Sequence, residues 1–128
     1  MSAWRRRALE AFPELRSELE SPDTTVYEVF FTLLPWCHNA HISGDEAALS
    51  RIYGFAGWCA RQPEKELWNA AGVAFYEHLT DSRVTLAAIP RWVPRDVFES
   101  VAGLLAARIG ADKVADLVLQ YDSGDGAQ

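Results

Sequence analysis

Three histidines are the residues of this chain best suited to metal or acid–base chemistry. His38 and His41 stand three positions apart, so one face of a helix could present both. A helical hairpin that turns near residue 62 would bring His78, which follows Glu77, level with His41. Imidazole and carboxylate groups gathered in this way are ligands for zinc or iron. His41 and His78 are therefore candidate metal ligands, and structural or surface histidines are the alternative.

The same end of that hairpin is a candidate small-molecule site. Glu77 beside His78 could form an acid–base pair with a shifted pKa, or could simply end a helix whose terminal carbonyls the histidine satisfies. With Tyr53 from the preceding helix, the candidate ligand-binding residues are His41, Tyr53, Glu77 and His78. No residue receives a catalytic role, because the chain has no G-x-S-x-G motif and its serines lie at expected helix ends. No motif for a cofactor is present either, so none is expected.

Five tryptophans are many for a chain of 128 residues. A domain of this size cannot bury all of them fully, and tryptophan is enriched at the centres of protein interfaces. Trp36, Trp58 and Trp92 are therefore candidate contacts with a partner protein. An aromatic-rich core is the alternative.

The charge of the chain favours some partners and disfavours others. A formal net charge of −6 argues against a general nucleic-acid binder, which needs a basic surface to displace counterions, and favours a basic protein partner. Arg5, Arg6 and Arg7 are the local exception, and we expect them on a solvated helix face. No signal peptide and no apolar run long enough to span a bilayer is present. We therefore expect a cytoplasmic protein without a membrane anchor, as a monomer or homodimer.

The two cysteines are expected to be small, reduced core residues. In the hairpin arrangement Cys37 and Cys59 differ in height by roughly 13 Å at 1.5 Å per helical residue. A disulfide requires Cα atoms within about 7 Å of each other, so this pair is excluded.

Apolar periodicity predicts an all-α fold of five to six helices, arranged as antiparallel helical hairpins in an irregular bundle or a short repeat-like array. The central pair of helices covers residues 45–81 and turns at Gln62-Pro63. Glycine inside a helix costs about 1 kcal/mol relative to alanine. We expect Gly54 and Gly57 to offset that cost by close packing against Ala70-Ala71-Gly72.

Local signals predict the ends of the remaining elements. Thr25 and Glu28 form a capping box that begins a helix kinked by Pro35 and ended by Gly44. Residues 82–94, with two prolines, are expected to be an ordered connector without a helix. Two further helices follow, the first from Pro94 to Gly110 and the second ending near Tyr121. Residues 1–121 would then form a single helical domain, and residues 122–128 a disordered tail.

Two motifs in the central pair carry a resemblance: Ile52-Tyr-Gly-Phe-Ala-Gly57-Trp and Leu67-Trp-Asn-Ala-Ala-Gly72-Val-Ala-Phe-Tyr-Glu-His78. From about Ala8 to Val118 the chain resembles a family of small, uncharacterised, all-helical bacterial proteins. The resemblance implies a helical fold, but no functional residue, because the family has no established activity. Small acidic helical proteins are also similar in style to toxin-immunity proteins, by analogy of fold alone.

We expect a non-enzymatic protein-interaction module, in its sharper form an immunity-like or adaptor protein that binds a basic partner. The alternative is a helical protein that binds a small molecule or metal between helices at the His41/His78 end.

Overall fold

The computed structural model describes the backbone of residues 1–127 and the side chains of residues 1–124. Eight α-helices lie within residues 1–127: α1 (Ala3–Ala11), α2 (Arg16–Glu20), α3 (Val26–Ser43), α4 (Glu46–Ala60), α5 (Lys65–Ala70), α6 (Arg83–Trp92), α7 (Arg95–Ile109) and α8 (Ala111–Ala127). Three short segments of other helical types are η1 (Pro13–Leu15), η2 (Ala71–Phe75) and η3 (Tyr76–Asp81). The predicted all-α class is confirmed, whereas the predicted number of five to six helices is too low.

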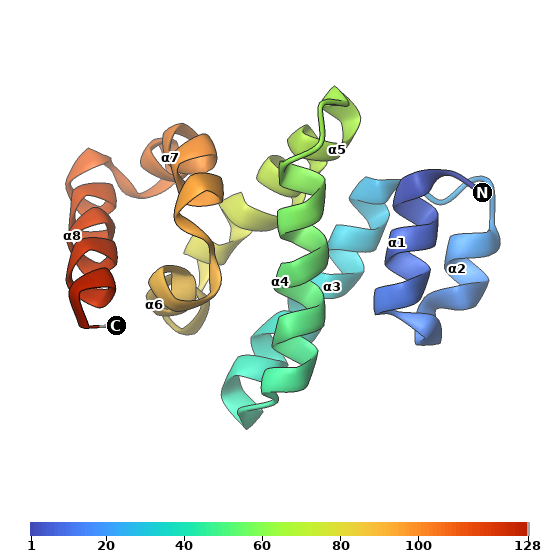
Figure 1. Ribbon diagram of the computed structural model, residues 1–128, viewed down its shortest axis with the longest axis horizontal. Coiled ribbons are helices and arrows are strands. Elements are labelled where there is room, and N and C mark those ends of the chain that lie inside the picture. Colours follow the sequence, from blue (N-terminus) through green and yellow to red (C-terminus); the bar gives the residue numbers. More distant parts are fainter. Residues whose placement is uncertain (128) are drawn as a thin grey trace.

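The helices follow one another along the long axis of the molecule (Figure 1). α1 and α2 lie at the end with the N-terminus, α3 and α4 cross the middle, and α8 lies at the far end. One hydrophobic core cluster extends from Trp4 to Tyr121. At its centre the Phe30 ring lies 5.4 Å from that of Phe55 and 5.7 Å from that of Phe75. The helices therefore share one core despite their serial arrangement.

The ends of α3 agree with the sequence signals. The hydroxyl of Thr25 accepts a hydrogen bond from the backbone N–H of Glu28, whose carboxylate accepts one from the backbone N–H of Thr25. Pro35 lies inside α3 without splitting it, and Gly44 ends the helix with a left-handed φ of 73°. The carboxylate of Asp45 then caps α4 by accepting from the N–H of Ala48.

The second helix of the central pair differs from the prediction. We expected one continuous helix from Pro63 to Asp81, but α5 ends at Ala70 and passes into a π-helical turn, η2, and then a 3₁₀ segment, η3. A π turn widens the helix and a 3₁₀ segment narrows it. Residues beyond η2 therefore face directions that a uniform α-helical repeat does not predict.

Residues 82–94 are mostly helical rather than a connector. Ser82 caps α6 through a hydrogen bond from the N–H of Val84. Pro90 lies in the last turn, where the missing N–H removes one backbone hydrogen bond and leaves the rest of the helix intact. The hydroxyl of Tyr121, from α8, donates to the carbonyls of Ile89 and Val93 at 3.2 and 2.6 Å.

We expected the basic run Arg5-Arg6-Arg7 to be solvated, but one of its side chains is bound to the protein itself. Arg5 donates hydrogen bonds to the carbonyls of Leu19 and Ser21 at 2.8 and 2.7 Å, and to that of Thr24. These carbonyls lie at and beyond the end of the five-residue helix α2, where no further helical turn can pair them. Arg5 therefore serves as a structural cap.

The chain beyond Tyr121 continues α8 to Ala127, where we expected a disordered tail from residue 122. Residue 128 lies outside the described residues. Within the described part of the chain, every helix is too short or too polar to cross a bilayer.

Candidate binding groove on helix α4

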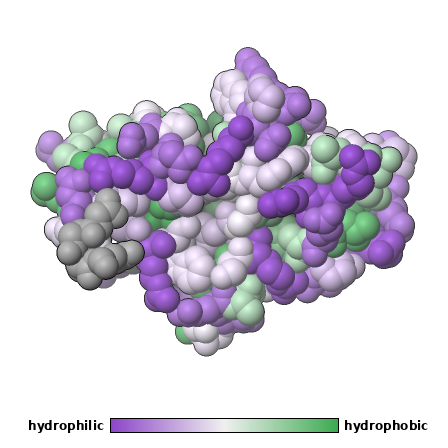
Figure 2. Space-filling model, viewed as in Figure 1, coloured by the Kyte–Doolittle hydropathy of each residue, from purple (hydrophilic) through white to green (hydrophobic). Residues whose placement is uncertain are grey.

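One face of α4 carries small residues, of which Ser50 and Gly54 are exposed and Gly57 is buried. Ser50, Gly54, Gly57 and Arg61 follow one another at spacings of four, three and four, which places them on one side of the helix. The opposite wall consists of Trp92 and Pro94, where α6 leads into α7, and Tyr53 completes the lining. Together these residues enclose a groove of about 260 Å³, which we call the α4 groove. In Figure 2 the middle of the molecule, over α4, is mostly pale and is bordered by hydrophilic side chains.

The glycines of α4 do not play the predicted packing role. A Cβ atom added at Gly54 would meet nothing within 4 Å, so this glycine does not let two backbones approach. The expected partner Gly72 contacts α7 instead, because an added Cβ there would lie 2.8 Å from Cδ1 of Leu104. α5 and η2 both pack against α4, but Gly54 is exposed and lies outside that contact. The cost of Gly54, about 1 kcal/mol, therefore has no internal packing to explain it.

The Gly57 end of the groove holds one exposed hydrogen-bond donor, Arg61, and a buried hydroxyl, that of Tyr76, lies near the same glycine. Arg61 donates from Nε and Nη2 to the carboxylate of Asp96 at 2.8 and 2.9 Å. Its Nη1, which has no hydrogen bond to any described residue, would lie 3.3 Å from a Cβ at Gly57. The hydroxyl of Tyr76 would lie 4.0 Å from that same Cβ, and Tyr76 is only 1% exposed. Within the described residues this hydroxyl is the buried side-chain polar atom that lacks a partner.

Three of the residues predicted as site candidates meet in the wall of the groove. The rings of Tyr53 and Trp92 stack with centroids 5.5 Å apart and an interplanar angle of 20°. Nε2 of His41 lies 2.7 Å from the hydroxyl of Tyr53, and the His41 ring meets Trp92 edge-on at 6.3 Å. Arg91 lies over the ring of Trp92 at 5.4 Å and forms an ion pair with Glu46. The wall is thus a fixed aromatic surface.

The protonation states of this cluster suit binding rather than proton transfer. Burial, with the positive charges of His38 and Arg91, lowers the pKa of His41, so its ring is neutral near neutral pH. Burial raises the pKa of Tyr53, so its hydroxyl keeps its proton. The neighbouring thiol of Cys37 is buried, with its pKa raised to about 11, and is not a thiolate nucleophile at neutral pH.

Glu77 and His78 lie elsewhere, so the expected meeting of His41 and His78 does not occur. His78 hydrogen-bonds Asp81 at 2.9 Å, and its ring lies 6.3 Å from that of Phe31. Phe31 precedes His41 by ten residues on α3, which is about 15 Å along the helix axis. The chain departs from helical geometry at Phe75, and η3, which carries Glu77 and His78, packs against α6 and α7 instead of continuing along α4. Glu77 pairs with Arg108 at 3.7 Å.

The described residues contain no group of three or more His, Cys, Asp or Glu side chains that could hold a metal ion. Cys37 and Cys59 are both buried and free, as predicted.

The other tryptophans named as partner contacts are half-buried under arginines. Arg51 lies 4.9 Å from the ring of Trp36, and Arg7 lies 5.7 Å from the ring of Trp58. Trp68, on α5, is 44% exposed. The charged residues three and four positions before it, Lys65 and Glu64, already indicated an exposed face.

Ser50, Gly54, Gly57, Arg61 and Tyr76 were not identified as site residues from the sequence. The available signal was the shared helical face of the first four, two of them glycines that a helix interior disfavours. No sequence signal indicated that the hydroxyl of Tyr76 lacks a partner, because that depends on the packing of α4, η3 and α7.

Comparisons with known proteins identify a family whose function is unknown. The family model described as "Domain of unknown function (DUF7674)" matches residues 5–104, which include every residue that lines the α4 groove. Searches of the curated proteins and of the solved structures give no match.

Proposed function

We propose that this chain, which belongs to the DUF7674 family of domains of unknown function, is a non-enzymatic protein-interaction module whose α4 groove receives a segment of a partner protein. The observation that carries this proposal is the open glycine face of α4. Glycine without a Cβ lets another backbone approach closely, and at Gly54 no part of the chain itself uses that space.

The donors and rings of the groove define the chemistry of the partner segment. Nη1 of Arg61 makes no hydrogen bond with any described residue, so the segment should present a carbonyl or carboxylate oxygen at the Gly57 end. The stacked rings of Tyr53 and Trp92 offer a flat apolar wall, which suits an aromatic or aliphatic side chain. Large rigid aromatics of this kind commonly contribute much of the binding energy of an interface.

The size of the groove argues for a protein partner rather than a free small molecule. Its volume of about 260 Å³ lies below the ~300–1,000 Å³ typical of small-molecule sites. A standard protein interface covers roughly 800 Å² on each partner, so the groove would form the centre of a larger contact. The small-molecule alternative loses the predicted His41/His78 site, because only His41 and Tyr53 of that set lie at the groove.

The net charge of −6 supports a basic partner, because opposite charges accelerate encounter between proteins. A basic partner can also supply the acceptor that Arg61 requires. Every protein has carbonyl oxygens along its backbone, so attraction between the opposite net charges does not conflict with a hydrogen bond at Arg61. An adaptor or immunity-like role in the cytoplasm, where the two free thiols would stay reduced, is the sharper form of the proposal.

A pair of glycine substitutions tests the proposal. Gly54→Leu fills the groove, and Gly103→Leu adds the same side chain at an exposed glycine of α7, where an added Cβ also meets nothing within 4 Å. The immobilised wild-type protein and both variants are exposed to extract from the source cells, and bound proteins are quantified by mass spectrometry. A genuine partner binds the wild type and Gly103→Leu, and is reduced at least about tenfold on Gly54→Leu.

Circular dichroism and melting curves establish that both variants fold. The partner is then purified and its dissociation constant measured against all three proteins. If no protein distinguishes Gly54→Leu from Gly103→Leu, the α4 groove is not an interaction site.

A further inference from the structure

A second concave surface lies between α6 and α8, at the opposite end of the molecule from α1 (Figure 1). This α6–α8 cleft has a volume of about 430 Å³. Its walls are formed by Arg83, Leu86, Ala87, Ile109, Lys113, Asp116, Leu117 and Gln120. None of these residues belongs to the α4 groove.

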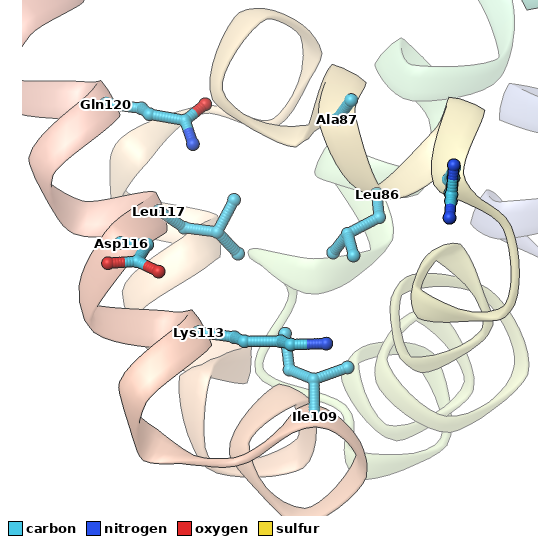
Figure 3. Close-up of a pocket in the computed structure, with 8 residues that line it drawn as sticks. Leu86, Ala87, Ile109, Lys113, Asp116, Leu117 and Gln120 are labelled. Carbon is cyan, nitrogen blue, oxygen red and sulfur yellow. The ribbon is translucent and has the colours of Figure 1, made fainter.

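The interior of the cleft is apolar. Figure 3 shows Leu86 of α6 and Leu117 of α8 facing each other across the space, with Ile109 at one end. Leu86 and Ile109 are half-buried, so part of each remains in contact with water. Covering apolar surface of this kind is favourable by roughly 25 cal/mol per Å².

The basic residues of the cleft stand apart from the other basic residues of the protein. Of the twelve Lys and Arg side chains, nine contact a carboxylate, a carbonyl or an aromatic ring: Arg5, Arg6, Arg7, Arg16, Arg51, Arg61, Arg91, Arg95 and Arg108. Lys65, Arg83 and Lys113 make no such contact with any described residue. Two of these three line the same cleft, although the chain carries eighteen acidic residues.

The acidic residue of the cleft does not neutralise this pair. Asp116 makes no ion pair with any described residue. In Figure 3 its carboxylate lies over α8, whereas the amine of Lys113 extends into the space between the helices. Like charges close together repel, so Asp116 disfavours a ligand with several negative charges.

We propose that the α6–α8 cleft binds an amphipathic organic monoanion, a carboxylate with an apolar body of the size of a medium-chain fatty acid. The apolar body would lie between Leu86 and Leu117, and the carboxylate would meet Arg83 and Lys113. The cleft volume lies within the ~300–1,000 Å³ of small-molecule sites. A neutral apolar ligand would leave both cations without a partner. The wall provided by α8 lies outside residues 5–104, so the stretch matched by the family model does not complete this site alone.

Two dyes that differ by one charged group test the proposal. Anilinonaphthalene sulfonate is an aromatic anion, and N-phenylnaphthylamine is its uncharged counterpart; both fluoresce when they enter an apolar site. We expect the anionic dye to bind more tightly, and sodium decanoate to displace it at lower concentration than decanol does. Equal binding of the two dyes, or no displacement by decanoate, would overturn the proposal.

Matched charge variants locate the anion. The double variant Arg83→Gln/Lys113→Gln should bind the anionic dye about two- to thirtyfold more weakly, since each of the two exposed ion pairs contributes about 0.2–1 kcal/mol. Its affinity for the neutral dye should not change. The control Arg16→Gln/Lys65→Gln removes the same charge on α2 and α5 and should bind both dyes as the wild type does. Equal loss in the two double variants would show a general charge effect and overturn the proposal.

A filling variant locates the apolar body. Ala87 is exposed and lines the cleft, so Ala87→Phe occupies the space without disturbing the core. It should weaken binding of both dyes, whereas unchanged binding would place the dyes elsewhere. Gly54→Leu should leave dye binding unchanged, which separates this test from that of the α4 groove. Near-ultraviolet circular dichroism of each variant verifies native packing.

Discussion

Replacing Gly54 by alanine should stabilise the protein and weaken its partner complex at the same time. Glycine inside a helix costs about 1 kcal/mol relative to alanine, and an added Cβ at this position meets nothing within 4 Å that would offset the gain. For a chain of 128 residues, about 1 kcal/mol corresponds to a rise of about 4 °C in Tm. Thermal and urea unfolding of the free protein measure this gain.

The other glycines within helices provide a graded series of controls. Gly103→Ala has an equally open environment and should give the same gain. Gly57→Ala should gain less, because its Cβ would lie 3.3 Å from Nη1 of Arg61, a flexible side chain that must move slightly. Gly72→Ala should gain nothing or lose stability, because Cδ1 of Leu104 would lie 2.8 Å from the new atom.

Affinity for the partner protein should distinguish Gly54→Ala from Gly103→Ala. The methyl group at position 54 enters the α4 groove, so Gly54→Ala should weaken the partner complex by about fivefold, the low end of the ~1–3 kcal/mol cost of overpacking. Gly103→Ala should bind as the wild type does. A Gly54→Ala protein that is more stable and binds its partner undiminished would show that the glycine does not serve the groove. A Gly54→Ala protein that is less stable would contradict the open environment itself.

Three further predictions concern buried groups. Burial raises the pKa of the Cys37 and Cys59 thiols to about 11 and about 12, so a disulfide reagent near neutral pH should label them only as fast as the protein unfolds; rapid labelling of the native state would contradict this burial. Burial lowers the pKa of His41 below 6.5, so the stability that its neutral form provides is present above that pH and is lost as the pH falls through the lowered folded-state pKa. His41→Gln should reduce the loss of Tm between about pH 7 and about pH 5, and an NMR titration of His41 with a pKa at or above 6.5 would refute the assignment. Tyr76→Phe removes a buried hydroxyl without a partner and should be neutral or stabilising by about 1 kcal/mol in urea unfolding, whereas a clear loss of stability would reveal a hydrogen bond to the hydroxyl.

The ends of several helices could be predicted because a few neighbouring residues decide them. The capping box of Thr25 and Glu28, the left-handed Gly44 and the Pro94 before α7 each act through backbone atoms within one turn. Pro90 shows the limit of such signals. A proline breaks a helix when it removes needed backbone bonds, but near the end of α6 few remain to be removed.

The predictions that compared positions on different helices failed where the winding changed. Placing His78 level with His41 assumed that residues 63–81 run straight along α4, whereas the chain departs from helical geometry at Phe75 and η3 packs against α6 and α7. The candidate site was therefore predicted in part: His41, Tyr53 and Trp92 were named, but their meeting was not. That meeting depends on α6, which the sequence reading had treated as an irregular connector.

The contact between Tyr121 and the end of α6 has a consequence for synthesis. Ile89 and Val93 are synthesised 32 and 28 residues before Tyr121, so at about 5–20 residues per second their carbonyls wait a few seconds for their donor. During that interval Phe98, whose ring lies 4.7 Å from that of Tyr121 in the finished protein, also lacks its aromatic neighbour. An incomplete chain therefore exposes the kind of surface that chaperones and proteases recognise. Synthesis of α8 hides that surface, so the end of α6 and the start of α7 reach their native packing only after α8 has been translated.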